Sequence, residues 1–214
     1  PEFIAGAHHK KMAEAFDKIA NGESKRLIIN MPPRHTKSEF ASYLFPAYLL
    51  GKRPKLKIIE ATHTADLAIN FGRRVRDLIE SDDYAEIFPA TQLKADSRSA
   101  GKWTTSQGGE YYAAGIGGAL AGRGADLFII DDPHSEQTAM STNGFTDAWD
   151  WYTGGPRQRL QPGGSIVLVQ TRWSEKDMTG QLLRAMAKDP LADQWEVVEL
   201  PAIFEDGTPC WPEY

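Results

Sequence analysis

The apolar residues of this chain fall into short continuous runs that alternate with longer stretches of helical spacing. Five runs of six or seven residues indicate buried strands, and they are 26–31, 56–62, 125–131, 165–171 and 195–201. Amphipathic spacing predicts helices at 37–51, 65–81 and 174–187, the last with Ser174 as its N-cap. A glycine-rich segment at 101–118 indicates a hairpin. Apolar strands alternating with helices predict an α/β fold, with a mostly parallel sheet covered by helices on both faces.

The composition agrees with one large α/β domain and excludes several other classes of protein. The 214 residues, 41% hydrophobic and 25% charged, can bury a sizeable core. No apolar run approaches the roughly 18 residues of a membrane-spanning helix, and the N-terminus lacks the apolar core of a signal peptide, so we expect a cytosolic protein. Cys210 is the single cysteine, and neither it nor the histidines have zinc-site spacing.

The net charge of −5 gives no overall attraction to nucleic acid, so any DNA binding has to come from local patches. Two arginine clusters are candidates, and they are Arg73, Arg74 and Arg76, and Arg157 and Arg159. Contact with DNA and an ordinary solvated surface both stay open for these arginines.

Ligands of parallel sheets bind beyond the carboxyl ends of the strands, and the segment after the first run carries Lys37 and Ser38. Lys37 could neutralise phosphate charge, Ser38 could ligate Mg²⁺, and the amides of 34–38 could point at phosphates from a helix N-terminus. The phosphate-loop pattern has glycine where this chain has Met31 and Thr36. Because glycine permits positive φ, we expect Thr36 to cost roughly 1 kcal/mol or more. The loop alone leaves nucleotide binding open.

Asp131 and Asp132 follow the third apolar run. A first acid in this position binds the magnesium that the loop serine also ligates, and a second can orient the attacking water. The alternative is a helix cap, with Asp132 as N-cap and Pro133 at the first helical position, and both roles are compatible. With Lys37 and Ser38 at another strand end, and a further strand possible between, the two aspartates predict a nucleotide site.

Four segments, taken together, resemble the ATPase domain of tailed-bacteriophage large terminase subunits, the DNA-packaging motors. They are NMPPRHTKSE, ADLFIIDDPH, VLVQTRWSEKDMTGQLL and ELPAIFEDGTPCWPEY. The resemblance spans about residues 5–214, and the order and spacing of the segments are more specific than any one of them. It implies a P-loop NTPase of the additional-strand, RecA-like class. We therefore expect residues 1–214 to form a single ATPase domain, without the C-terminal nuclease domain of the family.

The resemblance assigns roles by position, with ATP and Mg²⁺ as cofactors. It makes 31–38 the Walker A loop, although relatives usually keep glycine where Thr36 stands. Asp131 matches the Walker B acid that binds the metal with Ser38, and Asp132 the catalytic carboxylate. The implied nucleotide contacts are Pro33, Arg34, His35, Thr36, Lys37, Ser38, Gln170 and Thr171. The last two, with Arg172, match a coupling motif that senses the γ-phosphate, whereas Trp173 is expected to pack.

A packaging motor also needs a cation to stabilise the transferred phosphoryl group, often an arginine of the neighbouring subunit. Arg123, eight residues before Asp131 and flanked by Gly122 and Gly124, matches an arginine–glycine pair that precedes Walker B in the family. A flexible loop arginine is the alternative. Arg34, acting on its own subunit, is the competing candidate.

The resemblance implies double-stranded DNA, a portal protein and a small terminase subunit as partners. It also implies a homo-oligomeric ring when assembled, a monomer in isolation, and the host cytoplasm as the location. Two other readings stay open. A superfamily 2 helicase-like motor should have a second RecA-like domain, for which this chain has no room. A non-hydrolysing nucleotide-binding interaction module with a decayed loop is favoured by Thr36.

Overall fold

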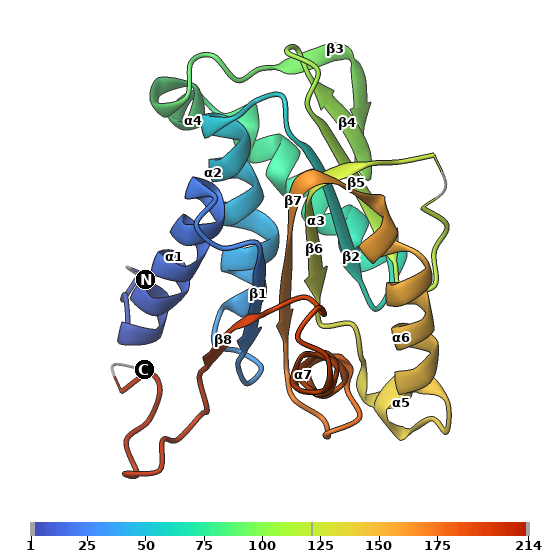
Figure 1. The fold of residues 1–214 in the computed structure, drawn as a ribbon. Helices are drawn as coiled ribbons and strands as arrows, with labels where there is room; N and C mark the ends of the chain where they lie inside the picture. Colours follow the sequence, from blue (N-terminus) through green and yellow to red (C-terminus); the bar gives the residue numbers. More distant parts are fainter. Residues whose placement is uncertain (1–2, 121, 213–214) are drawn as a thin grey trace.

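The computed structural model describes residues 3–120 and 122–212, and eight strands of this part form one sheet (Figure 1). The strands lie in the order β3-β4-β5-β2-β6-β7-β1-β8. Their bounds are β1 (Arg26–Asn30), β2 (Lys57–Thr62), β3 (Leu93–Ser99), β4 (Lys102–Thr105), β5 (Glu110–Gly115), β6 (Ala125–Asp131), β7 (Leu160–Gln170) and β8 (Glu196–Glu199).

Parallel pairing dominates this sheet. Every neighbouring pair from β5 across to β8 is parallel, and only β3–β4 and β4–β5 are antiparallel. Strand β7 lies between β1 and β6, which places an additional strand between the two that carry the predicted loop lysine and acid. This order confirms the predicted additional-strand fold class. It also brings the ends of β1, β7 and β6 side by side, with Asn30 opposite Gln170 and Asp131 opposite Val169.

Helices cover both faces of the sheet (Figure 1). One face packs against α1, η1, α2, α3 and α4, and the other against α6 and α7. The bounds are α1 (Ala7–Asn21), η1 (Glu39–Leu44), α2 (Phe45–Lys52), α3 (Ala65–Ile79), α4 (Asp82–Ile87), α5 (Glu136–Met140), α6 (Gly144–Gly154), η2 (Pro156–Arg159) and α7 (Met178–Lys188). Segment η1 is a π-helix and η2 a 3₁₀-helix. None of the helices within 3–120 and 122–212 has the length and apolar character needed to cross a membrane.

The central strands are buried on both sides, as their continuous apolar sequence predicts. In β6, Leu127 and Ile129 join the core under α1, α2 and α3, and Phe128 and Ile130 join the core under α6 and α7. Successive side chains of a strand point to opposite faces, so one unbroken apolar run serves both cores. After β8 the chain returns to the start of α1, where Trp211 contacts the ring of His8 at 5.1 Å between centroids.

The predicted strands and the hairpin are confirmed, but the predicted N-cap of the last helix is wrong. The five apolar runs become β1, β2, β6, β7 and β8, and segment 101–118 contains the antiparallel β4 and β5. Helix α7 has Asp177, not Ser174, as its N-cap, because the Asp177 carboxylate accepts the N–H of Gly180 at 2.9 Å. Ser174 Oγ accepts the N–H of Lys176 instead.

Candidate active site

Lys37 and Asp132 form an ion pair at the carboxyl edge of the sheet. Lys37 lies in the helical turn between the loop after β1 and η1, and Asp132 directly follows β6. Lys37 Nζ lies 2.8 Å from Asp132 Oδ2, and Lys37 is only 5% exposed. The other oxygen, Asp132 Oδ1, accepts a 2.7 Å hydrogen bond from the backbone N–H of Thr171, just beyond β7. Asp132 therefore joins the ends of the neighbouring strands β1, β7 and β6.

Asp131, the last residue of β6, is held by two serine hydroxyls. Ser38 Oγ donates to Oδ1 at 3.0 Å, and Ser42 Oγ donates to Oδ2 at 2.8 Å. Ser42 lies in the π-helical segment η1 and was not among the site residues predicted from the sequence. Its spacing of four from Ser38, about one helical turn, is the signal that would have found it. The structure thus brings Lys37, Ser38, Asp131 and Asp132 together.

The oxygen atoms around Asp131 fit a magnesium ion. Burial raises the pKa of Asp131 to about 7 and the charge of Asp132 adds to this, while Ser42, Ser38 and Lys37 act in the opposite direction. A nearby cation stabilises the anionic form of a buried carboxylate whose pKa is raised in this way. Carboxylate and hydroxyl oxygens are ligands that Mg²⁺ accepts, usually together with water and substrate phosphates. Asp131 and Ser38 are therefore the residues that would hold the metal.

We expect Asp131→Asn to stabilise the metal-free protein, and to do so more at high pH. The folded-state pKa of about 7 lies above the ordinary value of 3.8, so the folded protein keeps a proton that the unfolded chain loses between about pH 4 and 7. Folding stability therefore falls as the pH rises through this window. Asparagine cannot ionise. At about 1.4 kcal/mol per pKa unit, its advantage at pH 8 is a few kcal/mol at most and shrinks towards pH 4.

The measurement is urea unfolding of wild type and Asp131→Asn in EDTA, at several pH values from 4 to 8. A difference in unfolding free energy that stays constant over this range would show that Asp131 does not titrate as described.

The loop 31–38 has left-handed backbone at two residues that are not glycine. The φ angle is 65° at Arg34 and 68° at Thr36. Thr36 is the position where the phosphate-loop pattern has glycine, and a β-branched residue is a genuine outlier there. Pro33 and Arg34 are exposed, whereas His35 and Thr36 are half-buried. Non-glycine residues in this region are strained, and such strain clusters at functional sites.

The alternative reading of Asp132 as a helix cap is wrong. Helix α5 begins at Glu136 and has Ser135 as its N-cap, so Asp132 and Pro133 precede the helix. The backbone of Asp132 has a φ of 41°, which differs from the extended conformation of an N-cap residue. The carboxylate of Asp132 is used in the contacts with Lys37 and β7 instead.

The end of β7 is tied to helix α7 by an aspartate that the sequence pattern did not single out. Arg172 Nε lies 2.9 Å from Asp177 Oδ2, which also accepts the N–H of Trp173 at 2.9 Å. Asp177 itself is buried. Trp173, expected to pack, is 41% exposed. Gln170 is 1% exposed, and its side-chain amide has no hydrogen-bond partner within the described part of the chain.

Arg123 lies apart from this cluster. Its guanidinium carbon stacks 3.7 Å from the centroid of the Tyr112 ring, on β5. Strands β2, β6 and β7 separate β5 from β1, so the structure does not bring Arg123 to Lys37. Arg34, by contrast, lies in the loop itself and is exposed.

Both arginine clusters include side chains that pair with acids. Arg74 lies 2.5 Å from Glu39, and Arg157 lies 2.5 Å from Asp193. Carboxylates this close offset part of the charge that would attract a DNA phosphate backbone.

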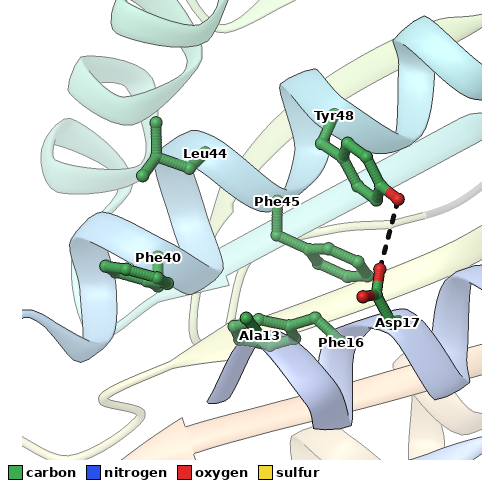
Figure 2. A pocket seen from close by; sticks show the side chains of 7 residues that line it. All are labelled: Ala13, Phe16, Asp17, Phe40, Leu44, Phe45 and Tyr48. Carbon is green, nitrogen blue, oxygen red and sulfur yellow. Dashed lines mark hydrogen bonds between the residues drawn. The ribbon is translucent and has the colours of Figure 1, made fainter. Parts of the chain in front are cut away.

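An apolar pocket of about 270 Å³ lies between α1 and the η1–α2 segment (Figure 2). Its lining residues are Ala13, Phe16, Asp17, Phe40, Leu44, Phe45 and Tyr48. Phe16 and Phe45 stack at 4.6 Å between ring centroids, and the Tyr48 hydroxyl bonds Asp17 at 3.2 Å (Figure 2). None of these side chains is a cation or a magnesium ligand of the cluster above, so the phosphate chemistry lies outside this pocket.

Comparison with solved structures finds this fold in a phage large terminase. The structure matches the HK97 bacteriophage large terminase with a TM-score of 0.61 and 14% sequence identity, over 96% of this chain and 41% of that one. A large terminase from a thermophilic bacteriophage, solved in complex with ATP-gamma-S, matches with a TM-score of 0.42 and 10% identity, over 90% of this chain and 45% of that one. No protein-family model matches the sequence, and no curated protein matches it. The chain spans less than half the length of either terminase, and its fold is the one found in the HK97 large terminase, in agreement with the motifs.

Proposed function

We propose that this chain is the ATPase domain of a phage DNA-packaging motor, which hydrolyses ATP to move double-stranded DNA into a procapsid. The observation that carries the proposal is the meeting of Lys37, Ser38, Asp131 and Asp132 at the carboxyl edge of one sheet. Support comes from the additional-strand order of that sheet and from its likeness to the fold of a large terminase.

Each of these side chains has a role that its chemistry suits. Lys37 binds the β- and γ-phosphates, and Ser38 and Asp131 hold Mg²⁺, which when bound neutralises charge on the transferred phosphoryl group. Asp132 orients the attacking water. Because Lys37 and Asp132 lie 2.8 Å apart, a phosphate that binds Lys37 competes with Asp132 for its ammonium group. Phosphate binding thereby frees the carboxylate to accept a hydrogen bond from water.

The end of β7 is suited to reporting the presence of the γ-phosphate. Asp132 already bonds the N–H of Thr171, and Arg172 is paired with Asp177 at the start of α7. A change at Asp132 is therefore transmitted through one strand end to a whole helix. Double-stranded DNA, a portal protein and a small terminase subunit are the partners that this function implies, in a ring of subunits within the host cytoplasm.

A non-hydrolysing nucleotide-binding module is the second candidate, and the backbone of Thr36 favours it. With a φ of 68°, this threonine stores strain in the loop that has to envelop the phosphates. ATP that binds with Mg²⁺ but is never hydrolysed, even in the presence of DNA and the assembled partners, would favour this module over the motor.

Lys37→Ala is expected to lose most of the affinity for ATP–Mg²⁺, because it removes the buried cation that faces the phosphates. We expect a rise in the dissociation constant of about 10²-fold, the scale of about 3 kcal/mol for a charge-assisted contact. The measurement is titration of a fluorescent ATP analogue in Mg²⁺. Lys55→Ala, which removes an exposed lysine from the α2–β2 connection, is the matched control. Equal binding by wild type and Lys37→Ala would overturn the site.

A further inference from the structure

His9, in the first turn of α1, contacts the threonine that stands in place of glycine in the phosphate loop. Its Nε2 lies 2.8 Å from Thr36 Oγ1, across 27 residues of sequence. His9 is 3% exposed, and its ring stacks on Phe40 at 5.1 Å and 25°. The imidazole is therefore fixed between its own helix and the segment that follows Ser38.

The hydrogen bonds around His9 determine which nitrogen carries the proton. The backbone N–H of Gly6 donates to His9 Nδ1 at 2.9 Å, so Nδ1 is an acceptor and the neutral ring carries its hydrogen on Nε2. Nε2–H then donates to Thr36 Oγ1. The Thr36 hydroxyl in turn donates to the carbonyl oxygen of His35 at 2.5 Å. Each N–H or O–H in this series of three hydrogen bonds has an acceptor, from Gly6 before α1 to the backbone carbonyl of His35 in the loop.

This chain of hydrogen bonds acts at the most strained residue of the loop. Thr36 has a φ of 68°, a conformation that glycine adopts without cost and threonine does not. A residue held in such a conformation persists only when its surroundings determine it. The His9 contact and the bond to His35 fix the side chain of Thr36, and through it the backbone that precedes Lys37 and Ser38.

We propose that His9 is a positioning residue, which holds the glycine-less loop in its phosphate-binding conformation through the hydroxyl of Thr36. The proposal rests on the proposed function for its link to ATP, but the bond between α1 and the loop is a property of the protein alone. It assigns a function to a substitution that the sequence pattern presents only as a defect. The hydrogen bond between the two side chains stabilises the positive φ of residue 36, which glycine would adopt without strain.

The test is a double-mutant cycle of His9→Ala and Thr36→Gly, read out by ATP affinity. In the Thr36 protein, His9→Ala is expected to weaken ATP–Mg²⁺ binding about 10-fold, the scale of one buried hydrogen bond. In the Thr36→Gly protein the same change should cost about 2-fold or less, since no hydroxyl remains to be held. His9→Gln, which keeps a side-chain N–H donor, should recover much of the loss. Equal effects of His9→Ala in the two proteins would overturn the proposal.

Hydrogen exchange of the loop amides in protein without nucleotide separates this proposal from the proposed function. His9→Ala should speed exchange at Lys37 and Ser38 about 10-fold with Thr36 present and much less with glycine, whether or not the protein binds ATP. Met12→Ala, a buried change in the same helix, is the control and should act alike in both proteins. Exchange rates of the Lys37 and Ser38 amides that do not change in His9→Ala would overturn the proposal. If these rates depend on His9 as expected but the protein does not bind ATP, only the proposed function is overturned.

Discussion

Arg123→Ala is expected to lower ATP turnover of the assembled motor by about 10³-fold or more, while nucleotide affinity stays nearly unchanged. An arginine that reaches the neighbouring subunit's site stabilises charge that develops only in the transition state, so its loss affects turnover rather than binding. In this role, Arg123 of each subunit reaches the ATP site of the neighbouring subunit.

The position of Arg123 favours this role over one in its own site. Its guanidinium stacks on Tyr112 of β5, and β5 and β1 are four strand positions apart. At about 4.8 Å per position, roughly 19 Å of sheet separates them, which exceeds the reach of an arginine side chain. Stacking on an aromatic ring also holds the cation in place.

Mixing two inactive variants distinguishes the two possibilities. Subunits with Arg123→Ala keep an intact loop, and subunits with Lys37→Ala keep the arginine. If Arg123 acts on the neighbour, mixed rings regain part of the ATPase rate, because an intact loop can lie beside an intact arginine. The experiment measures rate against mixing ratio, with the complete terminase assembled on portal protein and DNA. Co-assembly without any recovery would contradict the prediction and move it to Arg34.

Asp132→Asn is expected to lower turnover by about 10²-fold or more, with the dissociation constant for ATP within a few-fold of wild type. Asparagine keeps an oxygen for the N–H of Thr171, which Asp132 Oδ1 now accepts at 2.7 Å. It also tolerates the positive φ of 41° at this position better than most residues. What it loses is the anionic oxygen that can take a hydrogen bond from the attacking water.

Asp126→Asn is the matched control for this change. Asp126 lies near the amino end of the same strand, and its Oδ2 accepts the N–H of Lys57 at 2.8 Å, a bond that asparagine can keep. Its turnover should stay close to that of wild type. If Asp132→Asn also turns over normally, Asp132 only anchors the ends of β1 and β7.

The central strands could be predicted because burial on both faces leaves a long apolar run in the sequence, whereas the edge strand β3 (Leu93–Ser99) has no such run and was not predicted. The central strands are mostly apolar, apart from the buried Glu60 of β2, and β6 alternates between two cores. Helix α1 was missed although its pattern is present, since Met12, Phe16 and Ile19 are spaced for one buried face. Its polar, histidine-rich start obscures that spacing. Helix α6 was missed because its tryptophans and glycines have no strong helical preference.

In the candidate site, too, the residues marked by local sequence could be predicted, and those that depend on contacts between distant segments could not. Lys37, Ser38, Asp131 and Asp132 were predictable because each follows an apolar strand, and parallel strands end at one edge. His9 and Asp177 could not be found from spacing, since their partners are fixed only by the docking of α1 and by the turn before α7. The prediction of Ser174 as the cap was wrong because α7 begins only at Met178, where the Asp177 carboxylate accepts the N–H of Gly180.

The π-helical segment Glu39–Leu44 also sets the rotational phase of everything that follows it. A π-helical turn contains an extra residue relative to an α-helix, and each residue of an α-helix advances by about 100°. Deleting one residue between Ser42 and Phe45 would therefore rotate α2 by about that angle relative to the loop. Phe45 would turn away from Phe16, with which it stacks at 4.6 Å, while Ser38 and Ser42 kept their places. The extra residue thus lets one continuous helix present hydroxyls to Asp131 at its start and an apolar face to α1 further along.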